Sequence, residues 1–99
     1  MLPYRFTNEA LEDLDHLWEH IALDNIDAAD HVVTSITDAC ERLGEMPGLG
    51  HTRDDLTDRP VRFWPVGRYL VIYRPDRRPI DIIGVLHGSR DVSRILTGR

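Results

Sequence analysis

The chain has 99 residues, 41% of them hydrophobic, and a formal net charge of −5, which fits one soluble domain over residues 1–99. No apolar run approaches the roughly 20 residues of a membrane span, and the N-terminus lacks the pattern of a secretion signal, so we expect neither a membrane-spanning nor an exported protein. The single cysteine excludes an internal disulfide and predicts a cytoplasmic protein.

The N-terminal residues predict a short strand followed by an amphipathic helix. Residues 2–6 favour an edge strand, because a proline near its start is tolerated only there. Thr7 or Asn8 then caps a helix that is predicted to end near residues 24–25. Its apolar side chains recur on one stripe at helical spacing, so we expect this stripe, Trp18 included, to face the core.

A second helix follows after a short connection. Asp27 is its predicted N-cap, and its apolar stripe runs from Ala29 to Leu43 with a period close to 3.6 residues. Cys40 lies on this stripe and is predicted to be a buried small hydrophobe rather than a nucleophile. Gly44 is the predicted C-cap. The short connection predicts that the two helices form an antiparallel hairpin.

After a polar loop over residues 46–59, three apolar runs at 59–64, 68–74 and 80–91 predict an antiparallel meander. The last two runs are apolar on both faces, so each needs cover on both sides. The helical hairpin covers one face, and we expect a partner protein to cover the other. The remaining C-terminal residues predict a short helical turn or a mobile tail.

The predicted order is therefore β-α-α-β-β-β. It indicates a two-layer α+β domain with an antiparallel sheet packed against a helical hairpin. Charge follows the same division, because residues 1–49 carry eleven acids and two bases while residues 50–99 carry six acids and ten bases. All the bases are arginine. The basic half is thus expected to attract an anionic partner segment.

Two short motifs have ordinary interpretations. His16 and His20 match an H-x-x-E-H zinc-protease pattern, but their helix face is expected to point to solvent and no third ligand is evident. The segment Pro47–Gly50 lacks the Gly-Lys-Ser/Thr ending of a phosphate loop and is predicted to be a turn. We predict no metal and no cofactor.

The most informative residues for chemistry are four arginines and one histidine of the predicted sheet, namely Arg62, Arg68, Arg74, His87 and Arg90. Arginine for transition-state charge and histidine for proton transfer are what RNA cleavage uses. The residue types alone favour a structural role, in which Arg90 pairs with Asp91 or Asp81 and His87 closes a turn. Trp64 is equally consistent with a binding hot spot and with a side chain that only covers the core of this domain.

Several ordered segments resemble the toxins of the RelE/ParE superfamily, the toxic partners in bacterial toxin–antitoxin modules. Besides the element order, the similar segments are Ala10-x-x-Asp13-Leu14, Ala28-Ala29, Leu43-x-x-x-Pro47-x-x-Gly50, Arg68-Tyr69-x-x-x-Tyr73 and Leu86-His87-Gly88-Ser89-Arg90-Asp91. This resemblance covers nearly the whole chain and implies the superfamily's fold.

The resemblance implies one of two activities, each silenced by an antitoxin. RelE-like toxins cleave messenger RNA on the ribosome, whereas ParE-like toxins poison DNA gyrase. The chain has no lysine, no glutamate after Glu45 and no tyrosine after Tyr73, and its net charge disfavours ribosomal RNA. These features favour the ParE-like branch, with no catalytic residues, a ParD-like antitoxin and gyrase as partners, and no sequence-specific nucleic-acid binding.

Two alternatives stay open: an RNA-cleaving toxin that uses Arg62, Arg68, His87 and Arg90, and a non-toxic interaction module of the same fold. For the binding interpretation, we predict that a partner contacts an apolar and basic set of side chains. The set comprises Arg62, Trp64, Tyr69, Tyr73, His87, Arg90, Ile95 and Leu96.

Overall fold

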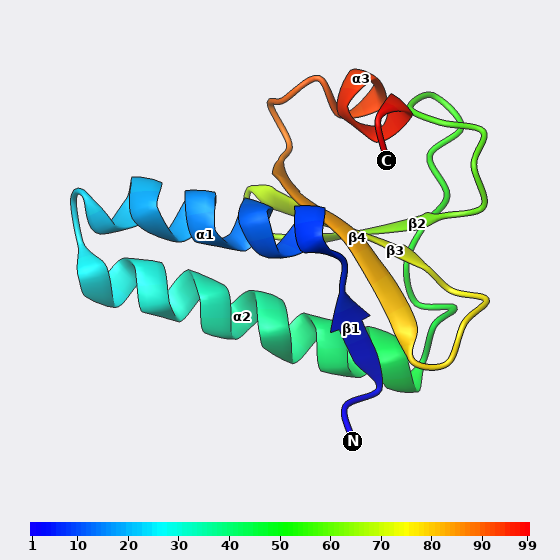
Figure 1. Ribbon diagram of the computed structural model, residues 1–99, viewed down its shortest axis with the longest axis horizontal. Coiled ribbons are helices and arrows are strands. Elements are labelled where there is room, and N and C mark those ends of the chain that lie inside the picture. The colour runs from blue at the N-terminus through cyan, green and yellow to red at the C-terminus, as the bar shows by residue number, and fades with distance from the viewer.

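The computed structural model describes residues 1–99 and confirms the predicted order, with one further helix at the end (Figure 1). Helices α1 and α2 lie antiparallel on one face of a four-stranded sheet, and α3 lies against the other face. None of the helices combines the length and the apolarity needed to cross a membrane. The elements are β1 (Tyr4–Phe6), α1 (Asn8–Ala22), α2 (Ile26–Glu45), β2 (Arg62–Val66), β3 (Tyr69–Arg74), β4 (Ile80–His87) and α3 (Val92–Thr97).

Both long helices begin at a side-chain cap. Thr7 Oγ1 accepts a hydrogen bond from the backbone N–H of Ala10 at 3.2 Å, which confirms Thr7 as the cap of α1. Helix α2 is capped by Asn25 rather than by Asp27, because the Asn25 side chain accepts from the N–H of Ala28 at 2.9 Å. Asp27 instead places its carboxylate in the first turn of α2, where the helix dipole stabilises it.

Gly44 is not the C-cap of α2, because the helix continues to Glu45. Its role is steric: a Cβ atom built on Gly44 would lie 2.5 Å from the carbonyl oxygen of Pro3. The missing side chain lets the residues before β1 cross closely over the last turn of α2. Gly44 therefore helps to dock the N-terminal strand.

The sheet has the order β1-β4-β3-β2, and the predicted meander is confirmed for its last three strands. Strand β1 departs from the prediction of an antiparallel sheet, because it pairs in parallel with β4, with Tyr4 opposite Ile80. The α1–α2 hairpin lies between these strands in the chain and forms the crossover that parallel pairing requires. Strand β1 is an edge strand, as predicted.

Both faces of the sheet are covered by the chain itself, so the prediction of one face left open for a partner is wrong. On the helical face, the sheet residues Val71 and Ile82 pack with the stripes of α1 and α2. On the opposite face, Ile72 and Ile83 pack with side chains of α3 and of the segment before β2. The C-terminal residues thus form a docked helix rather than a mobile tail.

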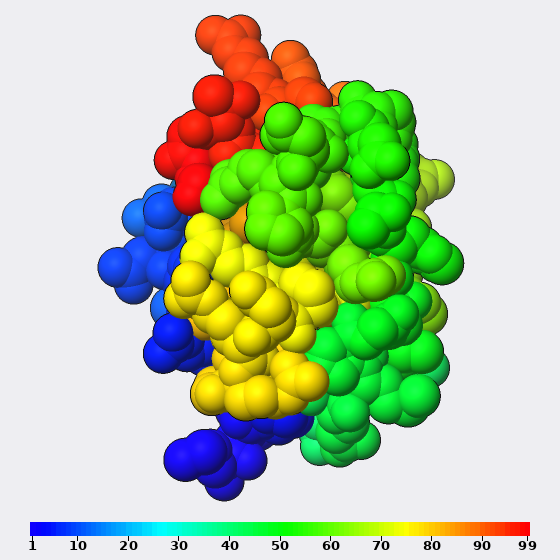
Figure 2. All heavy atoms as spheres, turned by 90° about the vertical axis from the view of Figure 1, so that its right-hand side faces the viewer, coloured from blue at the N-terminus to red at the C-terminus, as the bar shows by residue number.

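The end of the molecule seen in Figure 2 is covered by two connections. The turn between β3 and β4 lies beside the long segment between α2 and β2. This segment is tied to the sheet at His51, whose N–H and C=O both bond to Phe63 of β2. The exposed edge of β2 is thereby partly paired, which limits its tendency to pair with other chains.

Trp18 is only half-buried, which corrects its predicted core position. Its indole N–H donates to Asp30 Oδ1 at 2.7 Å, so the ring bridges α1 and α2 near their connection. A tryptophan at such a boundary keeps its ring on apolar neighbours and its N–H on a polar partner.

Candidate functional site

A groove of about 480 Å³ lies between α1 and the end of the β3–β4 pair. Three histidines and one arginine contribute to its walls, and we call it the histidine groove. Its lining residues are Asp13, His16, Leu17, His20, Tyr69, Val85, Leu86, His87, Ser89 and Arg90. Its volume lies within the usual range of ligand-binding sites in proteins.

Helix geometry and strand pairing bring the three histidines together. His16 and His20 are four residues apart on α1 and so lie on one side of the helix. His87 pairs with Tyr69 across β3 and β4, and their rings meet edge to face with centroids 5.3 Å apart. The α1 histidines are exposed, as predicted, but they face a groove rather than open solvent.

The groove does not have the ligand arrangement of a metal site. No group of three His, Cys, Asp or Glu side chains in the structure is placed to hold a metal ion. The glutamate of the H-x-x-E-H pattern, Glu19, does not line the groove.

The loop after β4 orients the His87 ring. The backbone N–H of Ser89 donates to His87 Nδ1 at 3.1 Å, and Ser89 Oγ lies 2.7 Å from the same nitrogen. A backbone N–H can only donate, so Nδ1 is the acceptor, and in the neutral ring the proton is on Nε2. The loop is held to the β2–β3 turn by a bond from the N–H of Gly88 to the carbonyl of Arg68 at 2.8 Å.

Arg90 is exposed and forms no ion pair, contrary to the predicted pairing with Asp91 or Asp81. Asp81 is buried and pairs with Arg5 at 2.6 Å and with Arg77 at 3.4 Å. Asp91 instead caps α3 by accepting from the backbone N–H of Arg94 at 3.3 Å. The guanidinium of Arg90 is therefore available at the rim of the groove.

The only acid that lines the groove, Asp13, is already neutralised. Arg99 donates to both carboxylate oxygens of Asp13 at 2.6 and 2.9 Å, and the N–H of Val85 donates to Oδ2 at 3.0 Å. Hydrogen bonding to Asp13 raises the pKa of the Arg99 guanidinium. Because Asp13 has these partners, it offers no free counter-charge to the histidines or to Arg90.

Two of the predicted contact residues, Tyr73 and Arg62, have structural roles at the opposite end of the sheet. Tyr73 is fully buried, and its hydroxyl donates to Pro47 O at 2.7 Å and accepts from the N–H of Gly50 at 2.8 Å. Arg62 donates to the carbonyl of Gly50 at 2.8 Å. These bonds fix the 47–50 segment onto the sheet. The prediction that Tyr73 contacts a partner directly is therefore wrong for the folded chain.

Trp64 lies on the helical side of β2 and packs between two residues of the same chain. The Arg42 guanidinium carbon is 5.9 Å from the centroid of its ring, and the His51 ring stacks on it at 6.1 Å. Half-buried in this way, Trp64 is cover for the core.

The residues named for RNA cleavage do not form one cluster. Arg62 is opposite Tyr73 in the sheet, whereas His87 is opposite Tyr69. Four positions along β3, at about 3.3 Å each, separate these two rows by about 13 Å. Arg68 lies in the β2–β3 turn near His87 and is exposed. The structure thus brings Tyr69, His87 and Arg90 together and leaves Arg62 apart.

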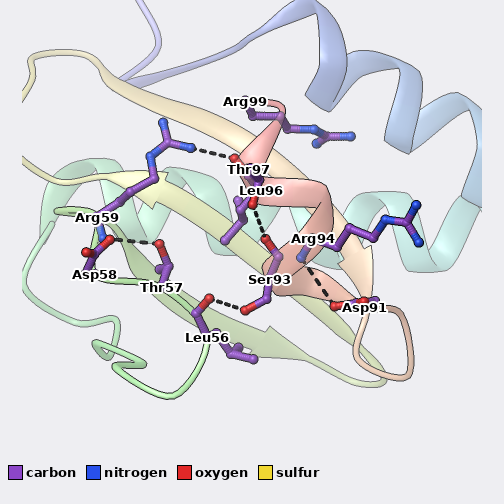
Figure 3. Close-up of a pocket in the computed structure, with 10 residues that line it drawn as sticks. All are labelled: Leu56, Thr57, Asp58, Arg59, Asp91, Ser93, Arg94, Leu96, Thr97 and Arg99. Carbon is purple, nitrogen blue, oxygen red and sulfur yellow. Dashed lines mark hydrogen bonds between the residues drawn. The ribbon is translucent and has the colours of Figure 1, made fainter.

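Helix α3 carries the last two predicted contact residues. Leu96 is 1% exposed and packs on the sheet, so the prediction of a direct contact is wrong for this side chain, while Ile95 is half-buried. Figure 3 shows how α3 is fastened: Arg59 donates to the carbonyl of Leu96 at 2.8 Å, and the Ser93 hydroxyl donates to the carbonyl of Leu56.

Comparison with known proteins gives one consistent result. Residues 4–92 match the family model described as the ParE toxin of the type II toxin–antitoxin system parDE. The chain is 31% identical over 90 residues to Toxin ParE1 of Caulobacter vibrioides. This alignment covers 90% of this chain and 92% of that protein. A structure titled as a chromosomal ParDE system from P. aeruginosa aligns with a TM-score of 0.70 at 22% identity, covering 88% of this chain and 96% of its own. This structural match supports the fold alone.

Proposed function

Because this chain belongs to the family of ParE toxins of type II toxin–antitoxin systems, we propose that it acts by binding DNA gyrase and that a ParD-like antitoxin silences it. In this proposal the toxin inhibits by contact rather than by catalysis. Its site of action is the cytoplasm, where gyrase works on DNA.

The observation that supports binding over RNA cleavage is the dispersal of the arginines and the histidine. Cleavage needs a base, an acid and positive charge around one phosphate. Arg62 is about 13 Å from the row of His87 and is bonded to the Gly50 carbonyl. The one remaining arginine at the histidine groove, Arg90, is not accompanied by a lysine or a free carboxylate.

RNA cleavage remains the second candidate because Tyr69, His87 and Arg90 do share one groove. A non-toxic interaction module is the third. The three candidates differ in what stops first when the chain is produced in a bacterial cell. A gyrase poison stops DNA synthesis first, an RNA-cleaving toxin stops protein synthesis first, and an interaction module stops neither.

The test is induced expression of the chain, alone and with the antitoxin of the same module, followed by pulse labelling of DNA and protein. We expect thymidine incorporation to fall before amino-acid incorporation, and co-expression of the antitoxin to restore both. Early loss of protein synthesis that is abolished by His87→Ala would refute the gyrase proposal and favour RNA cleavage. Normal growth with a stable, folded chain would favour the interaction module.

A further inference from the structure

We propose that the histidine groove is a carboxylate-recognition site that takes an acidic, partly apolar segment of the antitoxin. This inference rests on the proposed function, since it names where and by what chemistry the silencing partner binds. The groove presents several hydrogen-bond donors and no unpaired acid of its own.

The donors come from three separate elements and surround one space. His87, at the end of β4, has Nδ1 engaged with Ser89, so that Nε2 is the donor that stays available in the neutral ring. Arg90, in the loop after β4, has no partner for its guanidinium. His16 and His20 lie on the facing side of α1. Such a set of donors matches the oxygen atoms of a carboxylate.

Asp13 does not serve as a hydrogen-bond partner for these donors, because its carboxylate is already bonded. Its carboxylate is the only one that lines the groove, and Arg99 and the Val85 N–H take up both of its oxygens. Only 10% of the Asp13 side chain is exposed. The groove therefore offers Arg90 no free carboxylate of its own, and a carboxylate of a partner can take that place.

A peptide fits the surroundings better than a nucleic acid does. Helix α1 carries no arginine and five acids, namely Glu9, Glu12, Asp13, Asp15 and Glu19. Only the paired Asp13 lines the groove, so the acids of α1 oppose a long polyanion more than a single carboxylate held at His87 and Arg90. A polyphosphate needs several cations along its length, and Arg90 is the only arginine that lines the groove. The floor is apolar, with Leu17 and Val85, so side chains flanking a carboxylate can pack there. An acidic peptide segment with apolar neighbours meets both conditions.

The experiment is a double-mutant cycle on the intact toxin–antitoxin complex. Arg90→Gln and His20→Gln are made in the toxin because both side chains are exposed and neither forms an ion pair. Matched controls are Arg94→Gln on α3 and His31→Gln on α2, which are exposed and lie outside the groove. In the antitoxin, each Asp and Glu is changed to Asn or Gln in turn, and dissociation constants are measured by calorimetry.

We expect Arg90→Gln to weaken binding about 10- to 100-fold and His20→Gln to weaken it less, while the two controls bind as the wild type does. One antitoxin carboxylate is expected to show non-additivity with Arg90→Gln, which identifies it as the bound group. Circular dichroism of each variant checks that the fold is kept.

Full-strength antitoxin binding by Arg90→Gln and His20→Gln would overturn the inference and leave the proposed function intact. Failure of the wild-type chain to bind the antitoxin at all would overturn both. A single-stranded RNA decamer is titrated in parallel. RNA binding that depends on Arg90 and His20, with antitoxin binding unchanged, would assign the groove to nucleic acid instead.

Discussion

The Asp13–Arg99 pair should be the most important polar contact for stability in this chain. It joins α1 to Arg99, the second residue after α3, and Arg99 also donates to the carbonyl of Ile83 in β4 at 3.0 Å. The two side chains are 10% and 15% exposed, so both charges are largely removed from water. Arg99→Ala leaves the Asp13 carboxylate buried without its counter-charge.

Removing one partner of a buried ion pair costs about 3–5 kcal/mol. Two further bonds hold α3, from Arg59 and Ser93, so the helix is weakened rather than released. In a domain of this size, 1 kcal/mol lowers the melting temperature by about 4 °C or more. We therefore expect Arg99→Ala to lower it by at least about 12 °C.

The assay is urea unfolding followed by far-UV circular dichroism, with Arg94→Ala as the control because Arg94 is exposed and has no ion pair. The control should change the free energy of unfolding by no more than about 0.5 kcal/mol. Asp13→Asn combined with Arg99→Met should recover part of the loss, since no charge then stays buried. A decrease of less than about 1 kcal/mol in the free energy of unfolding of Arg99→Ala would refute the reasoning, because solvent-exposed ion pairs contribute no more than that.

Three further results are expected. Tyr73→Phe should lower the free energy of unfolding in urea by about 2 kcal/mol, because the buried N–H of Gly50 and the half-buried carbonyl of Pro47 lose their partner. Gly44→Ala should destabilise the fold by about 1–3 kcal/mol, despite the higher helix propensity of alanine, because its Cβ would meet the Pro3 carbonyl; a stabilised variant would contradict this. Burial raises the pKa of the Cys40 thiol from 9.0 to about 12, so between pH 9 and pH 12 the unfolded chain loses this proton first and stability falls. Cys40→Ala should reduce this decrease of stability at alkaline pH. An identical pH dependence of stability in both proteins would exclude the contribution of the Cys40 thiol.

The sequence predicted the elements well because the periodicities of this chain are local. The stripe of α2 and the alternation of β3 follow from neighbouring residues, and both were confirmed. The parallel pairing of β1 with β4 was missed because it joins residues far apart in the chain, such as Tyr4 and Ile80. Gly44 was misread for the same reason, since its steric partner, Pro3, lies in another element.

The candidate site was predicted only in part. Tyr69, His87 and Arg90 were named, and the structure places them in one groove. The facing residues of α1 were missed, although the spacing of His16 and His20 already put them on one side of a helix. Nothing in the sequence shows which strand end that side meets. The sequence also does not show that Tyr73 is buried. On a strand that is apolar on both faces, a tyrosine is as consistent with a contact surface as with the core.

The most direct measurement is a supercoiling assay with purified DNA gyrase, relaxed plasmid and increasing amounts of the isolated chain, with ribosomes carrying messenger RNA in a parallel reaction. The account predicts that supercoiling stops, that added antitoxin restores it and that the RNA stays intact. Uninhibited gyrase together with cleaved RNA would contradict the account and assign the histidine groove to catalysis.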